Sequence, residues 1–187
     1  LHNVVTVVGT NAKASMATAL STILKESSYK YNLYTSPHLQ SYTERFVFNN
    51  NEISENDLAI LLEDIDRILG DDNATVFEIL TSAFIKYAEN FKDNVNIIEA
   101  GLFHRFDSTN VFKQNLLTLL GVIHLDHLNW LDNKTIEGVI YEKTSSLPVS
   151  NIFVNNQMNS KIKTKIKKSL INNKSKQYFF GDDFNVA

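Results

Sequence analysis

The chain has 187 residues and a net charge of −3, with 43% apolar and 21% charged residues. This length suits one substantial domain with its own core, and the composition is not that of a disordered chain. The weak negative charge argues against a nucleic-acid binder that depends on a strongly basic surface. The chain has no cysteine, which excludes disulfides and thiolate metal sites.

The sequence does not indicate a membrane partner. The longest apolar run, residues 116–123, is far shorter than the ~18 residues that a bilayer crossing needs. No signal-peptide pattern opens the chain, and we expect a cytoplasmic monomer. The chain begins at Leu1, almost inside its first predicted strand and without a methionine, so we expect a fragment.

Predicted strands and helices alternate along the chain, as judged from β-branched runs and from apolar residues at helical spacing. In chain order, the pattern predicts a strand at 4–8, a helix at 13–28, strands at 29–34 and 45–48, a hairpin turn at 49–51, helices from Ser54 to about Gly70 and at 76–91, strands at 95–98 and 116–123, a helix at 134–147, a strand at 152–154, a helix at 160–170 and a strand at 177–180. Ser54 is predicted to cap its helix, with Asp57 as a capping-box partner. This alternation is typical of an α/β domain with a mainly parallel sheet flanked by helices.

Several polar positions follow directly after predicted strands. Gly9 follows the first strand, Glu99 follows the strand at 95–98, and His127 follows the strand at 116–123. In parallel α/β sheets, ligands bind at the carboxyl ends of the strands. We therefore expect Ser15, Glu99 and His127 to cluster at one edge of the sheet.

The first of these positions opens a candidate phosphate-binding loop. The strand is followed by Gly9, Thr10, Asn11, Ala12, Lys13, Ala14 and Ser15, and then by a helix. In such a loop, backbone N–H groups hold phosphates, a lysine neutralises their charge and a hydroxyl reaches Mg²⁺. Ala12 stands where a glycine is expected and has poor access to positive φ. An ordinary strand-to-helix turn is the alternative interpretation.

Other positions carry chemistry only in the context of a site. Glu99 after an apolar strand suits a Mg²⁺ ligand, and the alternative is a loop acid that caps a backbone donor. His124 and His127 flank Asp126 and suggest metal ligation, whereas the alternative is a polar loop with one hydrogen-bonded histidine. Lys143 lies on a predicted helix, where a lysine is usually solvated.

Taken together, seven segments resemble motifs of the folylpolyglutamate synthase and dihydrofolate synthase family, in the Mur-ligase superfamily. They are residues 9–15, Tyr-Thr-Ser-Pro-His-Leu at 34–39, Glu44-Arg45, Thr75 to Glu78 with Thr81, residues 99–110, Leu-Asp-His at 125–127 and Glu-Lys at 142–143. The intact Thr-Ser-Pro-His-Leu segment separates this branch from the peptidoglycan ligases. The resemblance implies that residues 1–187 are one incomplete, P-loop type ATP-binding domain of the Mur-ligase kind, with the C-terminal glutamate-binding domain absent.

The resemblance also implies an ATP-dependent amide ligase that uses Mg²⁺. ATP would phosphorylate the carboxylate of a pteroate or folate, and the amine of L-glutamate would displace phosphate from the acyl phosphate. By this resemblance, residues 9–15 hold ATP, the metal ligands are Ser15, Glu99, His127 and a carbamylated Lys143, and the substrate contacts come from Thr35, Ser36, Pro37 and His38. His127 and Lys143 would be the catalytic residues, in a reaction that needs positioning and charge neutralisation more than covalent help.

The chain departs from the family pattern at six glycine positions, which carry Ala12, Ala14, Phe103, His104, His124 and Ser145. We expect Phe103 and His104 to be the most damaging changes, since two bulky side chains cannot follow the path of two glycines. We expect Ala12 and Ala14 to weaken ATP binding. We also expect this chain alone to lack glutamate-ligating activity. The alternatives are a folded but inactive relative with weak nucleotide binding and an unrelated P-loop kinase or GTPase.

Overall fold

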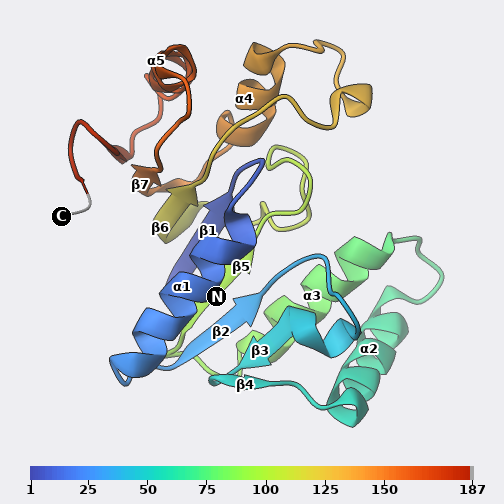
Figure 1. Ribbon diagram of the computed structural model, residues 1–187. Coiled ribbons are helices and arrows are strands. Elements are labelled where there is room, and N and C mark those ends of the chain that lie inside the picture. The colour runs from blue at the N-terminus through green and yellow to red at the C-terminus, as the bar shows by residue number, and fades with distance from the viewer. Residues whose placement is uncertain (186–187) are drawn as a thin grey trace.

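The computed structural model describes residues 1–185, in which strands and helices alternate (Figure 1). The strands are β1 (Val4–Val8), β2 (Tyr31–Tyr34), β3 (Phe46–Phe48), β4 (Asn51–Glu52), β5 (Val95–Glu99), β6 (Gln114–Leu120), β7 (Val149–Val154) and β8 (Lys176–Phe179). The α-helices are α1 (Lys13–Glu26), α2 (Glu55–Leu69), α3 (Val76–Ala88), α4 (Ile136–Thr144) and α5 (Ser160–Ser169), and the short 3-10 helices are η1 (Tyr42–Arg45) and η2 (Leu128–Trp130). Across residues 1–185, no helix has both the length and the apolar character that a membrane crossing requires.

The strands form one sheet in the order β4-β3-β2-β5-β1-β6-β7-β8. Every neighbouring pair from β2 to β8 is parallel, whereas β3 and β4 add an antiparallel hairpin at one edge. The hairpin turns at Asn49 and Asn50, which both have positive φ, as a two-residue turn with the twist of a hairpin requires. The predicted α/β class with a mainly parallel sheet is confirmed.

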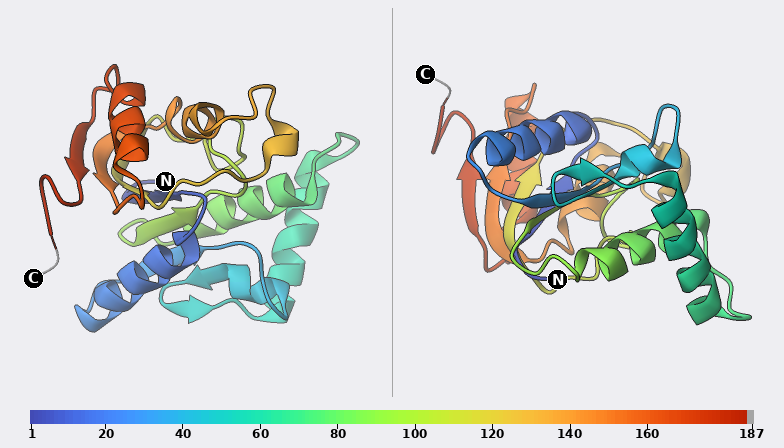
Figure 2. Two further views of the ribbon diagram at one scale, coloured as in Figure 1. Left: turned by 45° about the horizontal axis from the view of Figure 1, so that its top comes forward. Right: turned by 90° about the horizontal axis from the view of Figure 1, so that it is seen from below.

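The central strand β1 is buried on both faces, because helices cover the sheet from two sides (Figures 1 and 2). Val5 and Val7 belong to the apolar cluster beneath α1. On the opposite face, Val4 packs in the cluster with α2 and α3, and Val8 packs in the cluster with α4 and α5. Side chains alternate between the faces of a strand, so burial on both faces explains the uninterrupted β-branched run.

Several predicted element ends are wrong by a few residues, because loop contacts compete with the regular pattern. The strand predicted at 116–123 runs from Gln114 to Leu120 instead, and Val122 leaves the sheet to accept N–H groups from the loop after β1. The helix predicted at 134–147 begins only at Ile136, since the Thr135 hydroxyl accepts the N–H of Gly138 and caps it.

The helix caps agree with the sequence in part. The Ser54 hydroxyl accepts the Asp57 N–H at 3.1 Å, so the predicted N-cap of α2 is confirmed. A full capping box is found instead at η1 and at α3, where Thr75 accepts the Glu78 N–H and the Glu78 carboxylate accepts the Thr75 N–H. Glutamate can return to the backbone in this way, and the shorter Asp57 instead accepts the Ser54 hydroxyl proton.

Candidate nucleotide-binding site

The loop after β1 is fastened to the segment that follows β6. The N–H groups of Thr10 and Asn11 donate to the Val122 carbonyl at 2.9 and 3.2 Å. The Thr10 hydroxyl accepts the His124 N–H at 3.1 Å. These contacts hold the loop at the carboxyl edge of the sheet, where β1 and β6 end side by side.

Helix α1 begins at this loop without a side-chain cap. Ala12 occupies the N-cap position and cannot accept a hydrogen bond through its side chain, and no acidic residue lies in the first turn. The other α-helices are all capped, by Ser54, Thr75, Thr135 and Asn159. Uncapped N–H groups at the positive end of a helix dipole form an anion-binding site. This difference favours a phosphate loop over an ordinary turn.

Two lysines converge on one carbonyl oxygen beside that helix end. Lys13 Nζ donates to the Gly9 carbonyl at 3.2 Å, and Lys143 Nζ of α4 donates to the same oxygen at 3.1 Å. Lys143 Nζ also donates to the Leu102 carbonyl at 2.8 Å. Burial, together with the nearby charge of Lys13, lowers the pKa of Lys143 from 10.5 to about 7. Lys143 is only 2% exposed, so it does not take the solvated position that is usual for a lysine on a helix.

Glu99 ends β5, the neighbour of β1, and is buried at 2% exposure. Its Oε2 accepts the Ser36 N–H at 3.2 Å. Burial raises the pKa of Glu99, while the Ser36 hydrogen bond and the charge of Lys13 oppose that rise. A carboxylate whose charge is disfavoured by burial gains from a cation that comes into contact with it.

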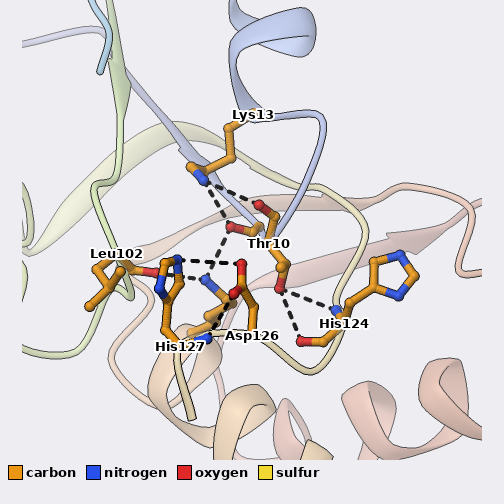
Figure 3. A network of polar contacts seen from close by, with 8 residues as sticks. Thr10, Lys13, Leu102, His124, Asp126 and His127 are labelled. Carbon is orange, nitrogen blue, oxygen red and sulfur yellow. Dashed lines mark hydrogen bonds and ion pairs between the residues drawn. The ribbon is translucent and has the colours of Figure 1, made fainter. Parts of the chain in front are cut away.

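The segment after β6 brings one histidine, not two, toward the lysines (Figure 3). His127 Nε2 lies 3.3 Å from Asp126 Oδ2, and its ring meets the Phe103 ring edge-on at a centroid distance of 6.3 Å. The Phe103 ring in turn covers Lys143, whose Nζ lies 5.0 Å from the ring centroid. His124 contributes its backbone to Thr10 and turns its ring away from this group (Figure 3). A metal site that uses both histidines is therefore not formed.

The three remaining metal-ligand candidates come from the carboxyl ends of adjacent strands, as expected. Ser15 follows β1 in the first turn of α1, Glu99 ends β5, and His127 follows β6. In the part of the chain that the structure describes, no three His, Asp or Glu side chains gather as a metal site. Mg²⁺ usually keeps water and phosphate oxygens besides one or two carboxylates, so these residues fit a cation that arrives with a nucleotide.

A carbamate on Lys143 fits the structure less directly as a cation ligand than Ser15, Glu99 and His127 do. Its carboxylate would lie against the carbonyl oxygens of Gly9 and Leu102, which now accept hydrogen bonds from the amine. These contacts would have to open before the carbamate could hold a second cation. Carbamylation of Lys143 stays a prediction.

The predicted substrate segment, residues 35–38, lies at the same edge of the sheet. The Ser36 N–H binds the Glu99 carboxylate, as described above, and His38 Nδ1 accepts a hydrogen bond from Arg45 Nε at 2.9 Å. The sequence placed Arg45 in a family motif but indicated no role for it. The only signal in the sequence was that Glu44-Arg45 is one of the segments that resemble the family. Its contact with His38 joins residues on either side of a loop, which no local pattern indicates.

The six glycine replacements differ in their effect on the backbone. Ala12 has a φ of 69°, whereas the other five are not among the residues with positive φ in the described chain. Ala14 lies within α1, where alanine is more favourable than glycine. Strain of the loop backbone therefore applies to Ala12 alone.

Phe103 and His104 turn inward and fill the space between their loop and α4. Phe103 packs against the apolar cluster beneath α4 and α5, and His104 is 1% exposed with Nδ1 3.2 Å from Ser146 Oγ. Burial and the nearby Lys143 charge lower the pKa of His104 from 6.5 to about 4. The pair is thus part of the packing around Lys143.

We expect Ala12→Gly to raise the free energy of unfolding by about 1 kcal/mol, because glycine adopts a left-handed backbone without the strain of a Cβ. Ala14→Gly should lower it by up to about 1 kcal/mol, because it replaces a good helix former in α1. Urea denaturation of the two single variants measures both changes. Shifts of the same sign would contradict the assignment of strain to Ala12.

No protein-family model matches the chain. The chain is 38% identical over 144 residues to the dihydrofolate synthase/folylpolyglutamate synthase of Bacillus subtilis, which covers 73% of this chain and 33% of that protein. Its fold is similar to that of an FPGS-AMPPCP-folate complex, with a TM-score of 0.87, 26% identity and coverage of 100% of this chain and 47% of that one. It is also similar to Escherichia coli FolC in complex with DHPP and ADP, with a TM-score of 0.85, 28% identity and coverage of 97% and 43%.

The matches agree with the motifs quoted from the sequence. The chain spans about a third of the length of the curated relatives it matches. The fold match to the FPGS-AMPPCP-folate complex covers the whole chain, so it includes the loop after β1, the segment after β2 and the lysine of α4. By sequence and by fold, the chain belongs to the dihydrofolate synthase/folylpolyglutamate synthase family and corresponds to its N-terminal part.

Proposed function

We propose that residues 9–15 bind the phosphates of ATP, and that this chain is the ATP-binding part of a ligase that adds L-glutamate to a pteroate or folate. The observation that carries the proposal is the uncapped start of α1, beside which Lys13 and Lys143 both donate to the Gly9 carbonyl. Phosphate groups suit both the free N–H groups and the charge of Lys13. The neighbouring Glu99 adds the carboxylate that a phosphate-bound cation requires.

In the proposed reaction, ATP phosphorylates the substrate carboxylate, and the amine of glutamate then displaces the phosphate. Lys13 and the N–H groups of α1 orient the transferred phosphoryl group and offset its charge. Mg²⁺, held by Ser15, Glu99 and His127, would supply further charge neutralisation. Lys143 braces the loop through the Gly9 carbonyl. Its pKa of about 7 leaves much of the amine unprotonated at neutral pH, which carbamylation requires.

We assign the substrate carboxylate to a pteroate or folate held by residues 35–38. This segment is tied to Glu99 through Ser36, so it lies next to the proposed cation site. The solved relatives hold DHPP with ADP in one case and folate with AMPPCP in the other. We also propose that the protein is cytoplasmic and monomeric, and that its glutamate site lies in a further domain.

The proposal is tested by trapping the acyl phosphate with hydroxylamine, which replaces glutamate as the amine. We expect the chain with Mg²⁺-ATP and dihydropteroate or folate to form the hydroxamate. Lys13→Met should reduce the rate at least about 100-fold, as loss of one phosphate-stabilising group does in comparable sites. Lys25→Met, an exposed lysine at the far end of α1, is the matched control and should leave the rate unchanged. Hydroxamate formation no faster than in the absence of protein would refute the ligase proposal for this chain.

A second candidate function is nucleotide binding without turnover. The strained φ of Ala12 and the Phe103 ring over Lys143 favour it, since both lie where phosphates and a cation would have to fit. This candidate predicts ATP binding with no hydroxamate. The alternative of an unrelated kinase or GTPase is wrong, because the chain belongs to the dihydrofolate synthase/folylpolyglutamate synthase family.

A further inference from the structure

We propose that Arg45 is a positioning residue, which holds His38 as a hydrogen-bond donor toward an acceptor oxygen of the bound substrate. Arg45 Nε donates to His38 Nδ1 at 2.9 Å. Arginine can only donate hydrogen bonds and stays protonated in proteins. Nδ1 of His38 must therefore offer a lone pair, so the ring carries its proton on Nε2.

The orientation of the His38 ring is held as well. Its centroid lies 4.2 Å from that of the Tyr42 ring, and the Arg45 guanidinium lies 5.5 Å from the same Tyr42 centroid. Tyr42 thus packs against both partners of the hydrogen bond. With one edge of the imidazole bound to Arg45 and one face against Tyr42, the Nε2–H points in a direction that the packing sets.

The backbone that carries His38 is anchored on both sides. Before it, the Ser36 N–H donates to Glu99 Oε2 at 3.2 Å. After it, the Glu44 carboxylate accepts the N–H groups of residues 39–41 at 2.8, 2.7 and 2.8 Å. These hydrogen bonds lower the pKa of Glu44. His38 is thereby placed relative to Glu99, at the edge of the sheet that carries the nucleotide loop.

A fixed Nε2–H donor has a defined chemical preference. It recognises an acceptor such as a heterocycle carbonyl or a carboxylate oxygen, and it has no lone pair on Nε2 for a metal ion. This assigns His38 to the substrate and leaves His127 as the imidazole for the cation. The identity of the substrate rests on the proposed function, whereas the tautomer of His38 does not depend on it.

The first test reads the tautomer directly from long-range ¹H–¹⁵N spectra of protein labelled in its histidines, at neutral pH. His38→Asn identifies the resonances of His38 by their loss. We expect the wild type to show the Nε2–H form, Arg45→Met to show a mixture of tautomers, and Arg45→Lys, which keeps a cationic donor, to restore part of the preference. Arg67→Met removes an exposed arginine paired with Asp64 on α2 and should change nothing. A wild-type Nδ1–H form, or spectra unaltered by Arg45→Met, would overturn the proposal.

The second test measures dihydropteroate binding by calorimetry in the presence of Mg²⁺-ADP. Arg45→Met and His38→Ala should each weaken binding about tenfold, as expected for one hydrogen bond to the ligand. The double variant should be little weaker than either single variant, because both remove the same interaction. Additive losses would overturn the link between Arg45 and His38. If the tautomer results hold but the wild type binds no pteroate, the proposed function fails and the positioning of His38 stands.

Discussion

Gly138→Ala should destabilise the protein by roughly 3 kcal/mol, the upper range for forcing an extra methyl group into a packed site. A Cβ at Gly138 would lie 2.1 Å from the backbone oxygen of Asn133. A backbone oxygen cannot turn aside as a flexible side chain can, so the loop before α4 must shift. That shift also strains the cap of α4, in which Gly138 N–H donates to the Thr135 hydroxyl at 3.2 Å. Because α4 carries Lys143, the change should reach the proposed nucleotide site.

Urea denaturation checks this value against a glycine that lies in open space. A Cβ at Gly70 would meet no atom within 4 Å, and its backbone conformation, with a φ of 60°, is the only source of strain. Because its ψ of −124° lies outside the left-handed helical region, we expect Gly70→Ala to cost about 2 kcal/mol through the backbone alone. A loss of stability in Gly138→Ala no larger than that in Gly70→Ala would show that the loop before α4 adapts freely.

Between about pH 7 and pH 9.5 the free energy of unfolding of the wild type should rise by roughly 3 kcal/mol because of Lys143, and Lys143→Met should remove most of this rise. Lys143 has a pKa of about 7 in the folded protein and 10.5 as its ordinary value. Below about pH 7 the amine is charged in both states, and its burial destabilises the fold in full. Above pH 7 the folded state releases the proton while the unfolded state keeps it, so stability rises with pH. Methionine fills a similar volume and has no proton to release.

The measurement is the free energy of unfolding of both proteins at several pH values in this interval. Lys25→Met, at an exposed position of α1, serves as the control and should follow the wild-type curve. Parallel curves for the wild type and Lys143→Met would mean that the buried amine titrates as it does in the unfolded chain. They would also remove the argument that Lys143 is poised for carbamylation.

Much of the fold could be predicted from the sequence because its elements carry local signals. The β-branched run of β1 and the apolar spacing of α2 depend on burial within one strand or helix, which residue order records directly. The placement of Ser15, Glu99 and His127 at one edge followed from a general property of parallel sheets. Element ends were less predictable, as at Val122, because a distant loop decides where the strand stops.

The contacts inside the site could not be read from the sequence, since they join residues far apart in the chain. Lys143 and Lys13 share a carbonyl oxygen although 130 residues separate them, and no local pattern distinguishes Lys143 from a solvated lysine. The inward turn of Phe103 was likewise hidden, because a replaced glycine indicates a changed backbone and not the direction of the new side chain. Among the six replaced glycines, only Ala12 keeps a backbone conformation that favours glycine, as the sequence predicted for this position.

The central claim, that the loop of Lys13 binds the phosphates of ATP, is tested most directly by calorimetric titration with Mg²⁺-ATP. We predict binding by the wild type, at least about tenfold weaker binding by Lys13→Met, as expected when a charge-assisted contact to phosphate is lost, and unchanged binding by Lys25→Met. Ala12→Gly should bind more tightly than the wild type, because it frees the loop from strain next to the phosphates. No binding by either the wild type or Ala12→Gly, or equal affinities for the wild type and Lys13→Met, would contradict the claim.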